Sequence, residues 1–510
     1  MNEIWETESG GKAGRIGRSL AAAFLALVVT TATGCVRILK PPTGVARPPN
    51  RTVPDSFNGL SDTRSSGLIP WRDFFQDAHL VTLVEAALKQ NQELNLAIQE
   101  TVVANAEVMA RRGEYLPKVG FGAGTGVEHV GKFTSPGQAD ERSEIGPNLQ
   151  KHEFGLYASW EIDVWGRLRT LANAASHRYL ASIEGRNFMV TRLVAEIASS
   201  YYELLALDRQ LRVVTDNIAL QERTLELARA QFQAGRATSA APARFEANLR
   251  AMQSSQYRIQ QRIVETENQL NFLAGSFPKP VDRASTDFLG QQPAAMAVGV
   301  PANLLANRPD VRQAELELAA AGLDVVAARK AFYPTLGIES VVGYQSFDLT
   351  KLINTPDSLL FTMVGKAFVP LLNRKGITAD YNAATSREMQ AVLRYERAVL
   401  TAFVEVSNRV SLTRTLSQGY GLKQQQVERL SQAVEISTEL FNLNRTEYLE
   451  VLTARRELLE AQQELVEMKQ QQMVATVTLY QALGGGWRST GLEPPDGTDA
   501  DHKFTQGVKP

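Results

Sequence analysis

Apolar and polar residues alternate in four stretches of the chain, each about ten residues long. The clearest stretch begins at Glu153, and the other three begin near Val119, Leu336 and Phe361. There, Phe154, Leu156, Ala158, Trp160, Ile162 and Val164 alternate with Glu153, Gly155, Tyr157, Ser159, Glu161 and Asp163. Because successive side chains of a strand point to opposite faces, the pattern predicts four strands, each with one apolar and one polar face.

The length of these stretches suits a strand that crosses a lipid bilayer at a tilt. The residues then expected to face lipid are Phe121, Phe154, Leu156, Trp160, Ile162, Phe361 and Met363. The charged residues expected on the opposite, lumen-facing side are Glu128, Glu153, Glu161, Asp163 and Glu339. Trp160, Trp165 and Tyr344 are expected at the membrane interface. A soluble β-domain alternates in the same way, so the pattern alone leaves that alternative open.

Other stretches carry apolar residues at helical spacing. They predict helices over 92–114 and 310–331, which Pro117 and Pro334 end, and much longer helical stretches over 170–234, 243–273, 377–443 and 447–483. Leu193, Ile197 and Tyr201 lie on a seam along which these helices are expected to pack. Gly419 and Gly421 are expected to interrupt the longest one. A 60-residue helix would be about 90 Å long, which is typical of coiled coils and tubes.

The two halves of the chain resemble each other. Residues 91–121 align with 308–338 without a gap, so that Arg112 meets Arg329 and Pro117 meets Pro334. Two later blocks align in the same order, which indicates an internal duplication. The predicted organisation is a signal peptide at 1–34, an extended lipidated segment at 35–70, a first repeat at 71–274, a linker at 275–308, a second repeat at 309–486 and a flexible tail at 487–510.

Four strands are too few to close a barrel, and lipid does not tolerate an open sheet edge. If the strands span a membrane, the barrel must be shared between chains. Three chains would supply twelve strands and leave room for a polar lumen. The polar segments 129–151 and 345–359 would then be the outer loops.

The N-terminus reads as an export signal. Basic residues precede the apolar run 20–29, and small residues lead from it to Cys35, the only cysteine of the chain. This arrangement resembles a lipoprotein box, in which the cysteine thiol receives the lipid, although Ala32 stands where leucine is usual. Val36 follows the cysteine. In the lipoproteins that this box resembles, an aspartate here signals retention in the inner membrane, so its absence favours the outer membrane. A plain secretory peptide with an incidental cysteine is the alternative, and the acidic leader leaves open whether Met1 is the true start.

Composition argues against nucleic-acid binding and catalysis. The formal net charge of −1 gives no basic field for nucleic acid. The five histidines and single cysteine do not fall in a zinc-like spacing. The glycine-rich run 120–126 lacks the Lys-Ser/Thr pair of a phosphate-binding loop and is better read as one bare face of a strand. No catalytic motif is present, so we expect no enzyme, no cofactor and no metal.

The long helices predict two hairpins whose turns lie far along the chain from the strands. The candidate residues for docking a partner at these tips are Gly235, Arg236, Asn444 and Arg445, and the candidate residues at a pore mouth are Glu447 and Glu450. Glycine and asparagine tolerate the left-handed backbone of a tight turn. The charges fit a ring at a pore mouth, with ordinary solvation as the alternative.

Several stretches together resemble the outer-membrane factor (TolC-like) family, and specifically its efflux lipoproteins. The most telling runs from Pro301 through Arg308-Pro309-Asp310 to Pro334. Further familial stretches are Trp71-Arg-Asp-Phe-Phe75, Tyr202-Glu-Leu204 and Leu479-Tyr-Gln-Ala-Leu-Gly-Gly-Gly-Trp487. The likeness covers nearly all of residues 68–487, and its motifs are specific only in combination.

The resemblance implies a mainly α-helical protein with a small membrane β-barrel. It implies a homotrimer with a 12-stranded barrel over a periplasmic α-helical tunnel, docked to a periplasmic adaptor and an inner-membrane pump, often of the resistance–nodulation–division type. Glu450 matches the family's gate acid, whereas Thr453 stands in place of a second acid and the first tip lacks its acid. The implied function is passive efflux of small molecules from the outer membrane of a Gram-negative bacterium. A type I protein-secretion duct and a periplasmic coiled-coil adaptor or scaffold lipoprotein are the alternatives.

Overall fold

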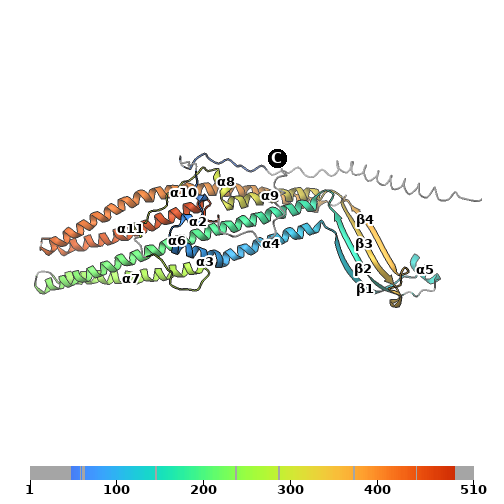
Figure 1. The fold of residues 1–510 in the computed structure, drawn as a ribbon, viewed down its shortest axis with the longest axis horizontal. Coiled ribbons are helices and arrows are strands. Elements are labelled where there is room, and N and C mark those ends of the chain that lie inside the picture. Colours follow the sequence, from blue (N-terminus) through green and yellow to red (C-terminus); the bar gives the residue numbers. More distant parts are fainter. Residues whose placement is uncertain are drawn as a thin grey trace, which may run out of the picture. The chain divides into compact units, whose positions relative to one another are not determined.

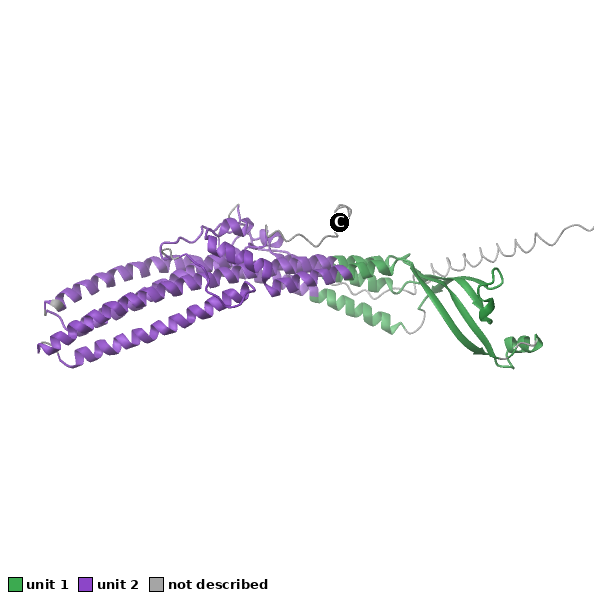
Figure 2. Cartoon of the chain, turned by 60° about the horizontal axis from the view of Figure 1, so that its bottom comes forward, with its two compact units in different colours: residues 1–47, 107–176, 319–390 green, residues 48–106, 177–318, 391–510 purple. Residues whose placement is uncertain are grey.

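The computed structural model describes residues 47–57, 59, 64–143, 146, 148–235, 238–284, 288–370, 374–443 and 445–488. The predicted leader, Cys35, Arg236 and Asn444 therefore lie outside the described residues. The chain forms two compact units, coloured separately in Figure 2. Unit 1 comprises residues 1–47, 107–176 and 319–390, and unit 2 comprises residues 48–106, 177–318 and 391–510.

Unit 1 contains one four-stranded antiparallel sheet with the order β1-β2-β3-β4. The strands are β1 (Lys118–His129), β2 (Asn148–Ile162), β3 (Thr335–Ser346) and β4 (Leu359–Phe368), as Figure 1 shows. The prediction of four strands is confirmed, although β2 begins earlier than its alternation suggested. The segments between paired strands contain the short helices α5 (Ser135–Arg142) and η2 (Leu349–Lys351).

Four helices flank the sheet along the chain. They are α4 (Gln92–Glu114), α6 (Arg167–Gln233), α9 (Pro309–Lys330) and α10 (Lys375–Asn442). The order helix, strand, strand, long helix is thus the same in both halves. No helix among the described residues is both long and apolar enough to cross a membrane.

Helix α10 is continuous over 68 residues, so the expected interruption at Gly419 and Gly421 is wrong. A glycine within a helix costs only about 1 kcal/mol relative to alanine, and packing along a long helix offsets that cost. At Gly419 an added Cβ would lie 3.0 Å from the end of the Met468 side chain, so the missing side chain allows a close approach.

Unit 2 contains two helical hairpins. Helix α6 leads into α7 (Ala240–Leu273), and α10 leads into α11 (Tyr448–Ala482). Shorter helices complete the unit: η1 (Ser66–Leu68), α2 (Trp71–Phe74), α3 (Ala78–Gln90) and α8 (Asn303–Asn307). Trp71, Tyr201 and Tyr480 are fully buried in one hydrophobic cluster. Leu193, Ile197 and Tyr201 are all buried, so the predicted packing seam of α6 is confirmed.

Irregular segments of unit 2 are attached to its helices by specific side chains. Phe57 is fully buried and stacks on Phe403 with ring centroids 5.4 Å apart. In the 275–308 segment, Arg283 donates hydrogen bonds to Asp208 and Glu267. Buried apolar residues such as Val298 extend this attachment. Apart from the short helices η1 and α8, the described parts of these segments are irregular in backbone, and they are nevertheless packed.

Candidate membrane sheet and helical tips

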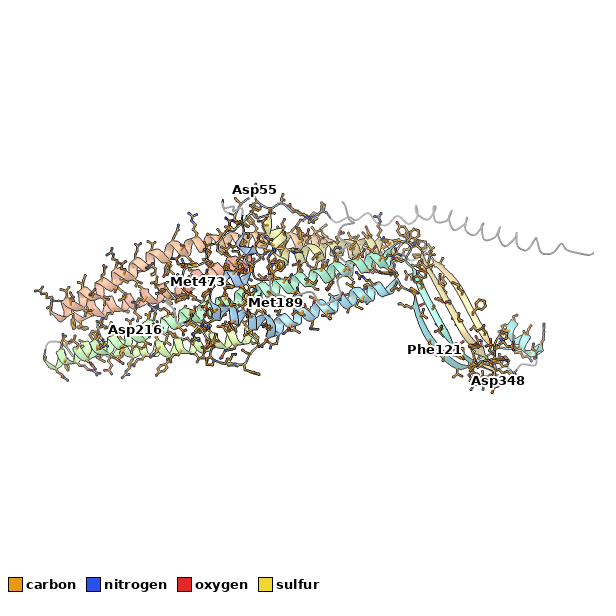
Figure 3. All side chains as sticks on the ribbon, viewed as in Figure 1. Asp55, Phe121, Met189, Asp216, Asp348 and Met473 are labelled. Atoms are coloured by element: carbon orange, nitrogen blue, oxygen red, sulfur yellow. The ribbon has the colours of Figure 1, made fainter. Side chains whose placement is uncertain are left out.

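One face of the unit 1 sheet is apolar across all four strands. Residues paired across antiparallel strands share a face. Phe121 is paired with Leu156, Phe154 with Tyr344, and Val342 with Phe361. The register places all seven predicted lipid-facing residues on this face, namely Phe121, Phe154, Leu156, Trp160, Ile162, Phe361 and Met363. Phe121, labelled in Figure 3, is 70% exposed and Phe361 is 77% exposed, which leaves a large apolar surface without cover in one chain.

The opposite face of the sheet is polar. Glu128, Glu153, Glu161 and Glu339 share it by the same register. Three of these carboxylates form ion pairs: Lys151 with Glu153 at 3.0 Å, Arg167 with Glu161 at 2.8 Å and Lys366 with Glu339 at 2.5 Å. These glutamates thus share one face, where their charges are partly neutralised. That this face lines a lumen stays a prediction.

Asp163 does not belong to this polar face, contrary to the prediction. Strand β2 ends at Ile162, so Asp163 lies beyond the sheet and is 9% exposed. Its carboxylate accepts hydrogen bonds from the backbone N–H groups of Leu168 and Arg169, at 3.0 Å and 2.9 Å. The first N–H groups of a helix have no partner within the helix. Asp163 therefore satisfies the N-terminus of α6.

Two tryptophans lie where the sheet meets the helices of unit 1. The Trp160 indole N–H donates to the Tyr115 carbonyl at 3.0 Å, and the Trp165 indole N–H donates to the Pro334 carbonyl at 2.7 Å. Trp165 also stacks on Tyr333, with ring centroids 5.2 Å apart. Both rings stay partly exposed, which suits side chains with an apolar ring and a polar N–H at a membrane boundary. Tyr344 lies toward the other end of β3, where its hydroxyl is 3.0 Å from that of Thr355.

The second helical tip lies in unit 2. Glu447 directly precedes α11, and Glu450 is in the first turn of that helix. Both carboxylates and Arg445 are exposed, and the Thr446 hydroxyl donates a hydrogen bond to Glu450. Acidic residues favour the first turn because the helix dipole places partial positive charge there. At the first tip, Gly235 has a φ of +73°, as predicted for a left-handed turn.

The two hairpins of unit 2 contact each other near these tips. Tyr448 at the start of α11 lies over Phe245 of α7, with ring centroids 6.3 Å apart. Tyr448 and Leu452 pack against the cluster formed by Leu225, Ala228, Phe245 and Leu249. The predicted gate acids thus lie at the start of a helix whose first turn packs against the neighbouring hairpin.

Arg455 is a residue of this region that sequence reasoning missed. It is 7% exposed, and its guanidinium donates hydrogen bonds to the Thr224 hydroxyl of α6 and, at 3.4 Å, to the Thr438 hydroxyl of α10. Burial lowers the pKa of Arg455 from its ordinary value. Its position one turn after the buried Val451 was the available signal, because a charged residue in an apolar seam needs partners.

The two structural features together define a class of protein. A sheet of membrane-length strands with one uncovered apolar face, continued into helices of 67 and 68 residues, is typical of outer-membrane channels with a helical extension. A model of the family "Outer membrane efflux protein" matches residues 83–276 and 300–485. The chain belongs to this family of outer-membrane channel proteins, and it is the outer-membrane component of an efflux system in a Gram-negative bacterium.

Named relatives cover most of the chain. The cation efflux system protein CusC of Escherichia coli O6:H1 is 27% identical over 86% of this chain and 94% of its own length. The solvent efflux pump outer membrane protein SrpC of Pseudomonas putida is 29% identical over 85% of this chain and 91% of its own length. The probable outer membrane lipoprotein SilC of Salmonella typhimurium is 25% identical over 82% of this chain and 88% of its own length.

Solved structures share the fold. A crystal structure of CusC has a TM-score of 0.77 at 25% identity and covers 86% of this chain and 99% of its own. A membrane protein from Pseudomonas aeruginosa has a TM-score of 0.80 at 24% identity and covers 87% of this chain and 99% of its own.

Proposed function

We propose that this protein is a passive duct, in which three copies form a 12-stranded barrel continued by a tunnel of helical hairpins. The observation that carries this proposal is the four-stranded sheet, whose apolar face and two edge strands are uncovered in one chain. In lipid, open edges leave backbone groups unpaired, at a cost of several kcal/mol for each group. Closing the edges with further copies removes that cost and turns the polar face of each sheet toward a common lumen.

The transported class that fits such a duct is small molecules, delivered by a periplasmic adaptor and an inner-membrane pump of the resistance–nodulation–division type. CusC is named for cations and SrpC for solvents, so the names of relatives select no substrate. The charged residues of the polar face are partly paired with one another, which suits a hydrated wall better than a specific binding pocket.

The gate of this duct is proposed to be the tip that carries Glu447 and Glu450. Three copies would place six of these carboxylates around one mouth. Exposed carboxylates of like charge attract cations, and salt screens the attraction over about 10 Å. The turn residues Gly235, Arg236, Asn444 and Arg445 are the proposed adaptor-docking surface. An adaptor seated on the tips would open them by separating the hairpins that Tyr448 and Phe245 join.

The anchor is proposed to be a lipid on Cys35. Cys35 is the only cysteine and follows an export signal, and the relative SilC is named a probable lipoprotein. The intact mass of the purified protein tests this directly, because Cys35→Ser removes the acyl mass if the proposal is right.

Conductance in planar bilayers tests the duct and its gate. We expect the purified protein to insert as a channel with low conductance and a preference for cations. Glu450→Gln should reduce that preference, because it removes one of the two exposed carboxylates each copy supplies at the mouth. Glu460→Gln is the matched control, since Glu460 is 62% exposed on the same helix but farther from the turn. Absence of channels would overturn the duct, and unchanged selectivity in Glu450→Gln would overturn the gate.

A further inference from the structure

Basic residues gather where the sheet of unit 1 meets its helices. Helix α9 ends with Arg329 and Lys330, and α10 begins at Lys375 directly after Arg374. Arg169 lies in the first turn of α6. These five residues, here called the basic cluster, all belong to unit 1, which is green in Figure 2.

Specific contacts bring the three helix ends of the basic cluster together. The Lys330 ammonium donates to the Gly166 carbonyl at 3.2 Å and to the Thr170 hydroxyl at 2.8 Å, both at the start of α6. The Arg374 guanidinium lies 4.7 Å from the centre of the Phe332 ring, just after α9. The Phe332 ring in turn packs edge-on against Tyr381 of α10. The ends of α9, α6 and α10, which carry the five cations, are therefore next to one another.

This placement runs against the usual charge preference of helices. Partial positive charge at a helix N-terminus favours acidic residues there and disfavours basic ones. Helices α6 and α10 nevertheless have no acidic residue in their first turns. Asp163, which precedes α6, supplies a carboxylate at that N-terminus. Helix α10 therefore departs from the preference more clearly, and such departures are expected mainly at functional sites.

Neutralisation within the described part of the chain is incomplete. Arg169 lies 3.9 Å from Asp163, whose oxygens already accept hydrogen bonds from α6. Among the described residues, Arg329 and Lys375 have no carboxylate within ion-pair distance. The nearest carboxylates along their own helices, Asp324 and Asp380, are more than one helical turn away. Arg329 and Lys375 of the basic cluster thus offer positive charge to an external anion.

The surroundings of the basic cluster indicate what that anion is. Trp165 is 44% exposed beside it and stacks on Tyr333. Strand β3 follows α9 and strand β4 precedes α10 in the chain. Ile338 and Met363 belong to the apolar face that these two strands share. Amphipathic aromatic rings next to an apolar band are typical of the membrane interface. Basic residues at that level attract anionic lipid headgroups.

We propose that the basic cluster binds the phosphate group of anionic phospholipids in the leaflet on the helix side of the sheet. Arg329 can donate paired hydrogen bonds to phosphate oxygens, and Lys375 adds charge at a helix N-terminus, where anions bind readily. The lipid tails would lie along the apolar face, with Trp165 at the level of the headgroups. This inference rests on the membrane placement of the sheet given under the proposed function.

The test reconstitutes the full-length protein into nanodiscs of equimolar phosphatidylcholine and phosphatidylglycerol and counts retained lipids by native mass spectrometry. We expect the wild type to retain phosphatidylglycerol preferentially. The double variant Arg329→Gln/Lys375→Gln should lower that preference roughly 25-fold, since each surface cation contributes about fivefold. Arg250→Gln/Arg456→Gln is the matched control, because these arginines are 69% and 65% exposed on α7 and α11. The control should keep the wild-type preference.

Several outcomes would overturn the inference. Equal retention of the two lipids by the wild type would do so without reference to any variant, so the test does not depend on the folding of the double variant. Equal loss in the control pair, or full retention in the double variant, would also contradict it. Displacement by soluble glycerol phosphate at matched concentration would show a site for free phosphate instead. Failure to insert into the bilayer would overturn the proposed function as well, whereas insertion without lipid preference overturns this inference alone.

Discussion

At the scale of single residues, Arg455 is the side chain whose surroundings are most unusual for its chemistry. Its guanidinium is buried between α6, α10 and α11, and its two partners are neutral threonine hydroxyls. Taking a charge out of water is costly unless an opposite charge compensates it. Thr224 and Thr438 also donate to their own helix backbones, so neither depends on Arg455 for a partner.

Replacing Arg455 therefore distinguishes a buried cation without a carboxylate partner from one that pairs with a carboxylate of another copy. If no carboxylate of another copy pairs with Arg455, Arg455→Met should leave the free energy of unfolding unchanged or raise it by about 1 kcal/mol, because a buried charge without a carboxylate partner is removed and the volume is retained. Thermal unfolding followed by circular dichroism measures the change. Arg456→Met is the control, because Arg456 is 65% exposed and should contribute little. A loss of about 3 kcal/mol or more would contradict this expectation and would mean that a carboxylate from another copy pairs with Arg455.

At the scale of elements, a row of glycines crosses the polar face of the sheet. Gly122 of β1 is paired with Gly155 of β2, and Gly155 with Gly343 of β3. A Cβ added to Gly155 would lie 2.6 Å from the Val342 carbonyl oxygen, and one added to Gly343 would lie even closer to the Phe154 carbonyl oxygen. The strands approach too closely here for any side chain. Glycines at such positions allow a sheet to curve, as closure into a barrel requires.

This row predicts a position-specific effect of a single methyl group. Gly155→Ala should destabilise the sheet by about 1–3 kcal/mol, because backbone atoms must move to admit the Cβ. The measurement is the fraction of heat-resistant oligomer recovered from outer membranes. Gly126→Ala is the matched control on the same face, because nothing lies within 4 Å of its added Cβ. Equal recovery of the two variants would show that the close approach at Gly155 does not restrict assembly.

The sequence predicted regular elements better than it predicted their ends and attachments. Strong periodicity located α4 and the phase of all four strands, since both depend on burial of one face. Asp163 was misplaced because alternation alone does not show where a strand stops and a helix cap begins. The contact of Phe57 with Phe403 and the hydrogen bond of Arg455 to Thr224 link positions hundreds of residues apart. Such contacts follow from tertiary packing, and local pattern carries no signal for them.

At the scale of the whole molecule, the open edges of the sheet decide how many copies assemble. Strands β1 and β4 each have one neighbour, so each presents a row of unpaired backbone groups. If β4 of one copy pairs with β1 of the next, the number of copies sets the size of the barrel. Three copies give twelve strands, which leaves a lumen wide enough for small molecules. A dimer would close eight strands, whose interior is just wide enough for side chains to fill.

Disulfide cross-linking across these edges tests the closure. In a Cys35→Ser background, a cysteine at Val119 of β1 is combined in turn with cysteines at Met363, Gly365 and Ala367 of β4, all on the apolar face. At least one combination should link neighbouring copies, and the oxidised products should form a ladder that stops at the trimer in denaturing gels. Cysteines at Ala158 and Ser340 are the control, because these residues are paired within one chain and should cross-link without increasing the mass. A ladder that ends at the dimer or continues past the trimer would refute the twelve-stranded barrel, because the edges would then close at another number of copies or not at all.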